Sequence, residues 1–184
     1  ICGVIIDGTS LWLDKVGEKV ASEKFTLTLD PNDKRINIGE RGTADGFRSE
    51  KVTLIEKGRL NTHFLNLYAA NKTGRPVVKN TSSDMIVEPG DLSLEELIAS
   101  VDKGLILGGF SGGSPGTNGE FSGVAKNSFL IENGKVKTAV TETMVNGNLS
   151  QIFNNIRGIS KELICRGSSV VPYIAVDGVV ISGK

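Results

Sequence analysis

The chain has 184 residues, of which 39% are hydrophobic and 23% charged, so it can bury one ordinary core and offset the entropy of ordering. Its 21 Lys and Arg residues balance 21 Asp and Glu residues, which argues against the excess positive charge that nucleic-acid binding requires. Two cysteines and short apolar runs favour neither a disulfide framework nor a membrane span. We therefore expect one domain over residues 1–184, cytoplasmic, with no nucleic-acid or membrane partner.

The first part of the chain is broken into short apolar runs by glycine. The whole sequence has 23 glycines against 5 prolines, a pattern typical of strands joined by tight turns. Apolar residues at helical spacing predict a helix over Ser10–Val20. Period-two alternation over Phe25–Leu29, which stops at an Asp-Pro pair, predicts a half-buried strand. Val52–Glu56 and Arg59–Phe64, joined by Lys-Gly, predict a hairpin.

Two helices and a second hairpin are predicted further along. Leu65–Lys72 has helical spacing, with a glycine placed as its C′ residue. Asp91–Ile98 offers Ser93 as an N-cap, with a glutamate three residues later. Ser128–Glu132 leads through Asn-Gly into Lys135–Thr143, which is typical of a hairpin with a type I′ turn.

A fourth short helix is predicted over Asn148–Ile156. About four short helices thus lie among eight or more strands, without a regular alternation of strand and helix. This arrangement favours an α+β fold with a mostly antiparallel, curled or barrel-like β-sheet.

The side chains of this sequence give little support for a hydrolytic activity. His63 is the only histidine, whereas a zinc peptidase helix needs two imidazoles and a carboxylate that activates water, so that motif is excluded. A Ser-His-Asp triad would have to use the same His63, and no Gly-x-Ser-x-Gly turn accompanies it. We interpret His63 as a structural or surface histidine.

Two other features allow both a functional and a structural interpretation. The glycine-rich stretch Gly108–Gly119 could cradle a phosphate, but no Gly-Lys-Ser or Gly-Lys-Thr ends it, which favours a mobile loop that could close over a bound peptide. Arg166 beside Cys165 would favour a thiolate, while burial among Leu163 and Ile164 would oppose it. The residue context alone favours a core cysteine.

Seven blocks follow one another in a fixed order from about Asp14 to Lys184. They are Val16–Ser22, Met85–Asp91, Leu94–Leu97, Gly104-Leu105, Asn118–Gly123, Phe129–Lys135 and Gly147–Leu149. Together they resemble the TldD/PmbA family, a peptidase-associated family also called modulators of DNA gyrase. The segment from Cys165 onward resembles the PmbA type, also called TldE, more than the TldD type. The resemblance implies that residues 1–184 are the C-terminal domain of a longer protein whose N-terminal domain is absent from this chain.

The same resemblance implies where chemistry would lie. TldD-type members carry a His-Glu-x-x-x-His zinc motif in the N-terminal domain, and a cysteine of the C-terminal domain completes the site. Cys165 occupies that cysteine's place, but PmbA-type members lack the histidines, so Cys165 is only a candidate metal ligand. We expect no cofactor in this chain, and zinc in the full-length protein or a partner subunit. The candidate substrate-binding residues are Asn118, Gly119 and Phe121.

Two functions are consistent with these features. The first is a peptidase-associated domain of a zinc metalloprotease system. Such a domain would bind extended peptides and pair with a TldD-like subunit, or with itself as a dimer, for proteolysis or peptide maturation. The chain alone is then expected to be inactive. The alternative is a non-enzymatic regulatory module that modulates a partner such as DNA gyrase.

Overall fold

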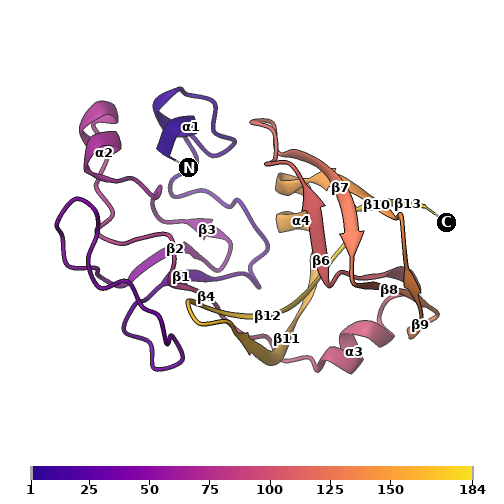
Figure 1. The fold of residues 1–184 in the computed structure, drawn as a ribbon. Coiled ribbons are helices and arrows are strands. Elements are labelled where there is room, and N and C mark those ends of the chain that lie inside the picture. The colour runs from indigo at the N-terminus through magenta and orange to yellow at the C-terminus, as the bar shows by residue number, and fades with distance from the viewer. Residues whose placement is uncertain (1, 184) are drawn as a thin grey trace.

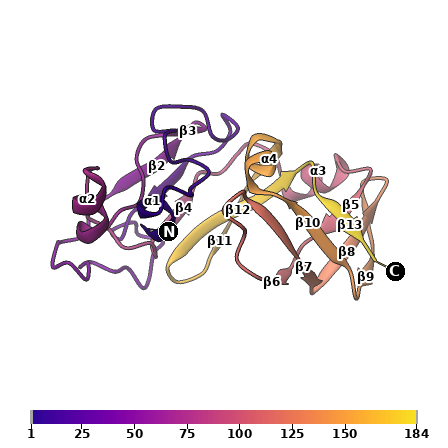
Figure 2. The same cartoon turned by 90° about the horizontal axis from the view of Figure 1, so that it is seen from above.

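The computed structural model describes residues 2–183, in which thirteen strands form three open sheets with four short helices around them. The six-stranded sheet lies in one half of the molecule, and the two smaller sheets lie together in the other half (Figure 1; Figure 2). The expected α+β class, the mostly antiparallel pairing and the number of helices are confirmed. Across residues 2–183 the strands do not close into a ring.

The six-stranded sheet combines strands from the two ends of the chain. Its order is β11 (Ile156–Cys165), β12 (Ser169–Val176), β4 (Met85–Val87), β1 (Leu27–Leu29), β2 (Val52–Glu56) and β3 (Arg59–Leu60). All neighbours are antiparallel except β12 and β4, which are parallel. The hairpin predicted at Val52–Glu56 and Arg59–Phe64 is confirmed, although its second strand is shorter than expected. Lys57 and Gly58 form its turn with φ values of 46° and 78°.

The two smaller sheets are antiparallel throughout. One has the order β13 (Val180–Ser182), β10 (Met144–Asn148), β7 (Glu120–Lys126) and β6 (Gly109–Gly112), and the other β5 (Lys103–Ile106), β8 (Ser128–Glu132) and β9 (Lys135–Val140). The Asn-Gly hairpin is confirmed between β8 and β9. Asn133 and Gly134 have φ values of 50° and 69°, as a type I′ turn requires.

The helices are α1 (Cys2–Ile6), α2 (Leu67–Thr73), α3 (Leu94–Ala99) and α4 (Leu149–Asn154). The last three confirm predicted helices, and their caps show why they form. Ser93 and Glu96 make the expected capping box at α3, and Gly74 ends α2 in the left-handed conformation. Asn148 caps α4 by accepting a hydrogen bond from the Ser150 amide. Between residues 2 and 183 no helix combines the length and apolar character needed to cross a bilayer.

The helix predicted over Ser10–Val20 is wrong. The segment forms a series of turns, and its backbone is engaged by the β2–β3 hairpin. The amide of Gly17 donates to the carbonyl of Leu60 at 2.7 Å, and that of Val20 donates to Gly58 at 2.8 Å. Pairing with a distant strand therefore satisfies the amides that a helix would have used internally.

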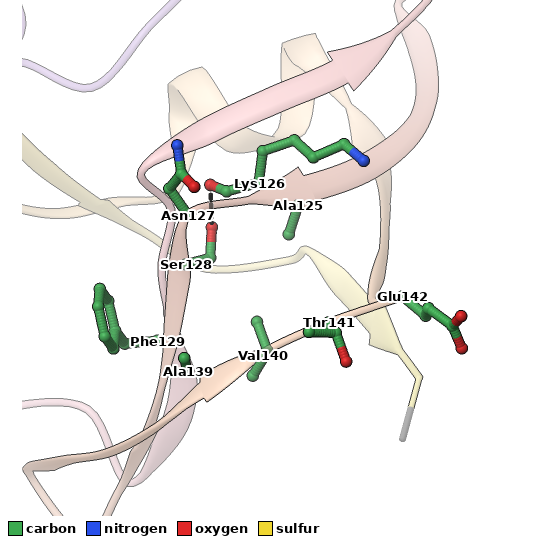
Figure 3. A pocket seen from close by; sticks show the side chains of 9 residues that line it. All are labelled: Ala125, Lys126, Asn127, Ser128, Phe129, Ala139, Val140, Thr141 and Glu142. Atoms are coloured by element: carbon green, nitrogen blue, oxygen red, sulfur yellow. Dashed lines mark hydrogen bonds between the residues drawn. The ribbon is translucent and has the colours of Figure 1, made fainter.

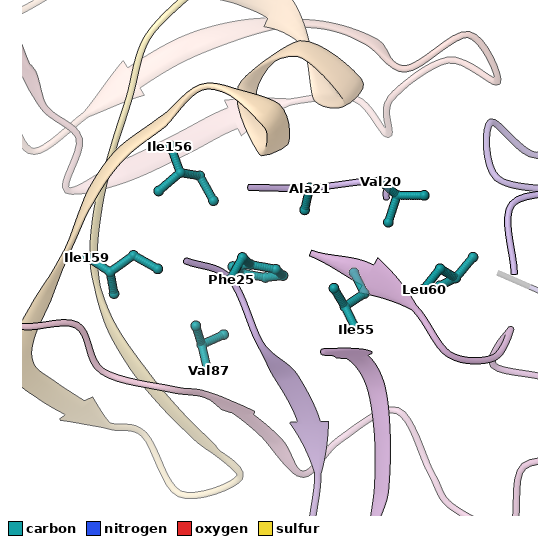
Figure 4. Packing of buried hydrophobic residues seen from close by; sticks show 8 residues of the cluster. All are labelled: Val20, Ala21, Phe25, Ile55, Leu60, Val87, Ile156 and Ile159. Atoms are coloured by element: carbon teal, nitrogen blue, oxygen red, sulfur yellow. The ribbon is translucent and has the colours of Figure 1, made fainter. Parts of the chain in front are cut away.

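The principal core lies between the six-stranded sheet, α4 and the 20–25 segment. Its buried apolar residues gather in one cluster (Figure 4): Val20, Ala21, Phe25, Ile55, Leu60, Val87, Ile156 and Ile159. Phe153 of α4 packs on this cluster, with its ring centroid 5.3 Å from that of Phe25 and 5.7 Å from that of Trp12. This packing holds α4, and with it the start of the helix at Asn148, against the sheet.

Candidate functional site

The glycine-rich stretch Gly108–Gly119 divides into a strand and a turn. Its first part contains β6, which pairs with β7 from Gly109↔Lys126 to Gly112↔Gly123, so the expectation of a loop over the whole stretch is wrong there. The second part ends in a hydrogen-bonded turn. The amide of Gly116 donates to the Glu120 carbonyl at 2.8 Å, and the amide of Gly119 donates to the Gly116 carbonyl at 2.8 Å.

Asn118 and Gly119, two of the predicted site residues, are tied to the start of α4. The side-chain amide of Asn148 donates to the Asn118 carbonyl at 2.9 Å, and the amide of Leu149 donates to the Gly119 carbonyl at 2.8 Å. Gly119 has a φ of 84°, and a Cβ there would lie 2.6 Å from Cδ1 of Leu11. The positive φ therefore favours glycine at this position, and a larger residue would also have to displace the Leu11 side chain.

Phe121, the third predicted site residue, lies across a face of the four-stranded sheet that glycine keeps open. It pairs with Gly147 of β10, where a Cβ would approach the Phe121 ring to 2.9 Å. The ring of Phe110 meets that of Phe121 edge to face, with 5.8 Å between centroids and 79° between planes. Phe110 is 40% exposed. The aromatic pair thus forms part of an accessible surface.

A groove of about 570 Å³ opens beside this pair. Its lining combines aromatic, aliphatic, amide, hydroxyl and carboxylate groups: Ser114, Glu120, Phe121, Asn146, Asn148, Gln151 and Val180 are among the residues that contribute. Such a lining offers apolar contact together with hydrogen-bond donors and acceptors, which suits the binding of a polypeptide segment. We call this site the β7–β10 groove.

A second hollow of about 560 Å³ lies where the four-stranded and three-stranded sheets meet. Figure 3 shows the side chains of Ala125 and Val140 facing each other across it, while that of Glu142 points away. Asn127 and Glu142 both adopt positive φ, at 48° and 50°, where the chain crosses between the two sheets. The hollow is therefore part of the connection between the sheets, and it contains none of the predicted site residues.

Cys165 is the last residue of β11 and is exposed, so the expectation of a core cysteine is wrong. The hydrophobic cluster at this end of the sheet consists of Ile36, Ile86 and Val170, with Leu163 packed against it. β11 stops at Cys165, where the chain turns, and the thiol consequently stays outside that cluster.

Charged groups lie close to this thiol. The pKa of the Arg35 guanidinium is raised, chiefly by its hydrogen bond to Asp33 and to a smaller extent by the charge of Cys165. Within residues 2–183 no group of three or more His, Cys, Asp or Glu side chains is suited to hold a metal ion. Cys165 can therefore contribute one thiolate ligand, and a metal site would need its other ligands from another domain or subunit.

His63 has the structural role that the sequence suggested. It is 8% exposed, its Nε2 lies 2.7 Å from the carbonyl oxygen of Trp12, and its Nδ1 lies 3.3 Å from a guanidinium nitrogen of Arg75. These bonds connect the turns after α1 to the segment that follows α2. The ring is engaged on both nitrogens and lies outside the β7–β10 groove.

The structure brings Asn118, Gly119 and Phe121 together and leaves Cys165 elsewhere. The first three meet at one end of the β7–β10 pair, whereas Cys165 lies beside the 33–38 segment. Sequence reasoning missed Asn148, which lines the groove, and Phe110, whose ring contacts that of Phe121. Asn148 had a usable signal, since it is the first residue of the helix predicted over Asn148–Ile156 and belongs to the Gly147–Leu149 block. Phe110 had none, because only the β6–β7 pairing places it beside Phe121.

The fold and the groove define a class of protein: an α+β domain with open sheets and an accessible surface of aromatic and amide groups. Residues 3–183 match the family model of the PmbA/TldA metallopeptidase C-terminal domain. The chain belongs to this family.

Relatives and solved structures agree with this assignment. The chain is 30% identical over 177 residues to a metalloprotease of Methanothermobacter thermautotrophicus, covering 86% of this chain and 37% of that protein. A crystal structure of a candidate modulator of DNA gyrase from Bacteroides thetaiotaomicron is 33% identical, with a TM-score of 0.88 over 100% of this chain and 42% of that chain. TldE from Thermococcus kodakarensis is 28% identical, with a TM-score of 0.84 over 99% of this chain and 45% of that chain. The chain thus spans about two fifths of the length of these proteins.

Proposed function

We propose that residues 1–184 form a single domain, the C-terminal domain of a longer cytoplasmic TldD/PmbA-like protein. This domain binds extended peptides and assembles with a zinc-bearing TldD-like subunit, or with a second copy of itself, for proteolysis or peptide maturation. The observation that carries the proposal is the β7–β10 groove. Phe121 and the amide groups of the groove, with Phe110 against Phe121, lie on a small sheet whose edge strands are β6 and β13.

Peptide binding follows from this geometry. An extended peptide can pair with the main chain of an edge strand and so gain affinity with little dependence on its sequence. Strand β6 is the edge nearest Phe121, and β13 is exposed along its whole length. Side chains of the bound peptide would then contact Phe110 and Phe121, while Asn146 and Gln151 supply polar contacts.

Hydrolysis is assigned to the zinc-bearing partner. Zinc in that subunit would supply an activated water and polarise the peptide carbonyl. We place this chain with the PmbA type, in which the thiol of Cys165 is accessible without a metal. In a TldD-type protein the same exposed thiolate would complete the zinc site. The exposure of Cys165 fits either role, because ligands from another domain could reach it.

The binding proposal is tested with a labelled unstructured peptide and a protection assay. Phe121→Ala is expected to weaken peptide binding to the chain about tenfold or more, because it removes an aromatic contact at the centre of the groove. Phe129→Ala, which removes a 43% exposed ring on the other small sheet, is the matched control and should leave affinity unchanged. Equal effects of the two substitutions would refute the groove as the binding site.

The catalytic part of the proposal is tested by adding a TldD-like subunit. The chain alone should leave the peptide intact with or without added zinc, and cleavage should begin when the subunit is present. Chelator-sensitive cleavage by the purified chain would contradict this assignment.

The subfamily is decided by the zinc content of the full-length protein, as wild type and as Cys165→Ala. A PmbA-type protein should contain no stoichiometric zinc in either form, and Cys165→Ala should preserve partner-dependent proteolysis. Stoichiometric zinc that is lost on substitution would instead identify a TldD-type protein.

A second candidate function is a regulatory module acting on a partner such as DNA gyrase. It is supported by the similarity to the Bacteroides thetaiotaomicron protein, which is described as a candidate modulator of that enzyme. A supercoiling assay with purified gyrase separates the two candidates. A stoichiometric change in gyrase activity, without peptide binding to the chain, would favour the second.

A further inference from the structure

Four buried side-chain oxygens have no hydrogen-bond partner within the part of the chain that the structure describes. They are Oγ of Ser49, Oδ1 of Asn80, Oγ1 of Thr81 and Oδ1 of Asp84. Asp84 is 0% exposed, and Ser49 and Asn80 are each 4% exposed. Leaving one such group unsatisfied costs about 1–3 kcal/mol, and more when the group is charged. All four belong to two short segments, which indicates a common cause.

Hydrogen bonds hold these two segments side by side. The amide of Glu50 donates to the carbonyl of Lys79 at 2.8 Å, and the side-chain amide of Asn80 donates back to the carbonyl of Glu50. Ser49 and Asn80 are therefore neighbours across this contact. The Asn80 side-chain nitrogen thus donates a hydrogen bond to the backbone, whereas the side-chain oxygen has no hydrogen-bond partner among the described residues.

The 40–41 segment connects Ser49 to Asp84. The amide of Ser49 donates to the Arg41 carbonyl at 2.9 Å, and the amide of Glu40 donates to Oδ2 of Asp84 at 3.0 Å. The preceding Gly39 packs so closely that a Cβ there would lie 2.4 Å from the carbonyl oxygen of Pro31. The 40–41 segment therefore contacts both Ser49 and Asp84, and only one oxygen of the buried Asp84 carboxyl group receives a hydrogen bond.

The charges around Asp84 are negative. Burial raises the pKa of Asp84; the Glu40 amide opposes this, and the charges of Glu40 and Asp30 raise the pKa further. The described ion pairs do not include Asp84, and Lys51, the nearby cation, lies 3.6 Å from a carboxylate oxygen of Asp30. The two charged groups that shift the pKa of Asp84 are therefore both carboxylates, which would attract a positive charge placed against it.

We propose that Ser49, Asn80, Thr81 and Asp84 bind a hard cation that joins the 40–41, 49–50 and 79–84 segments. The potential ligands are one carboxylate, one amide oxygen and two hydroxyl oxygens, with no sulfur or imidazole. Oxygen ligands of this kind favour Ca²⁺, Mg²⁺ or an alkali cation over zinc. The site includes neither Cys165 nor any residue that lines the β7–β10 groove, so its test is independent of the proposed function.

The experiment measures thermal unfolding of the 184-residue chain after treatment with chelator. CaCl₂, MgCl₂, NaCl and KCl are each compared with choline chloride at equal ionic strength, and the metal content of the purified chain is measured. At least one of the four cations is expected to raise the Tm saturably above choline. Asp84→Asn, which keeps the shape and removes the charge, should abolish that rise, and Asp102→Asn, at an exposed carboxylate, should preserve it.

Ser49→Ala serves as a second variant if Asp84→Asn does not fold. It should raise the cation concentration at the midpoint of the Tm rise about tenfold, because one ligand is lost. The proposal is overturned if no cation raises the Tm of wild type above its value in choline chloride and the purified chain retains no metal. Buried water or a protonated Asp84 would then account for the unpaired oxygens. A rise that survives Asp84→Asn would overturn it as well. Where Ser49→Ala is the variant used, an unchanged midpoint of the rise would overturn it.

Discussion

The two halves of the molecule are built on different principles. The three hydrophobic clusters of the described chain all lie on the six-stranded sheet or on the helices and turns around it. The two smaller sheets contribute no residue to these clusters, and they expose Phe110, Phe129 and Val180 by 40%, 43% and 62%. The first half therefore contains the contiguous hydrophobic clusters, whereas the smaller sheets bury apolar residues outside any such cluster, among them Ala125, Ile131 and Val145.

The largest effect is expected from a cavity in the first half. Phe25→Ala removes a 4% exposed ring from the principal core and should lower the free energy of unfolding by about 3–5 kcal/mol. Phe129→Ala, in the second half, should lower it by less than about 1 kcal/mol, since that ring is already partly hydrated. Urea denaturation of both variants measures the difference. Similar losses in the two variants would remove the contrast between the halves.

A smaller effect is expected from closing the glycine face of the second half. Gly147→Ala places a methyl group 2.9 Å from the ring of Phe121, which must then tilt, at a cost of about 1–3 kcal/mol. Peptide affinity should fall along with stability, because the same ring lines the groove. Gly3→Ala is the matched control, since its Cβ would meet no atom within 4 Å and Gly3 does not line the groove. Unchanged peptide affinity in Gly147→Ala would show that the Phe121 ring does not contribute to binding.

Asn148→Ala should lower the free energy of unfolding by about 1 kcal/mol, the usual value for loss of an N-cap. It removes the hydrogen bond from the Ser150 amide and the bond to the Asn118 carbonyl. Hydrogen exchange should become faster in α4 and in the 116–120 turn together. Faster exchange in α4 alone would show that Asn148 does not hold the turn.

The smallest effect concerns pH. A hydrogen bond from the Arg35 side chain, then one from the Arg35 amide, lower the pKa of Asp33 below its ordinary value of 3.8. A lowered folded-state pKa stabilises the fold above about pH 4, and this contribution is lost as the pH falls through the lowered pKa. At neutral pH the free energy of unfolding of wild type should exceed that of Asp33→Asn by at most about 1 kcal/mol. Urea denaturation from pH 7 to pH 2 should show that this difference shrinks only below about pH 4.

Local patterns in the sequence determined the elements that depend on neighbouring residues. The capping box at Ser93, the left-handed glycine after α2 and the Asn-Gly turn were all predictable, because each rests on hydrogen bonds or φ values within a few residues. The ordered blocks that resemble the TldD/PmbA family likewise identified the family, and three residues of the Asn118–Gly123 block, Glu120, Phe121 and Ser122, line the groove. These features need no knowledge of distant partners.

Tertiary structure alone decided the rest, because long-range partners overrode local preference. The Ser10–Val20 segment has helical spacing, yet its amides pair with the β2–β3 hairpin. Cys165 follows two apolar residues, yet it is exposed because β11 ends there beside a charged segment. The unsatisfied oxygens of Ser49 and Asp84 are 35 positions apart in the sequence. Only folding brings them close together, since it is backbone bonds between three separate segments that enclose them.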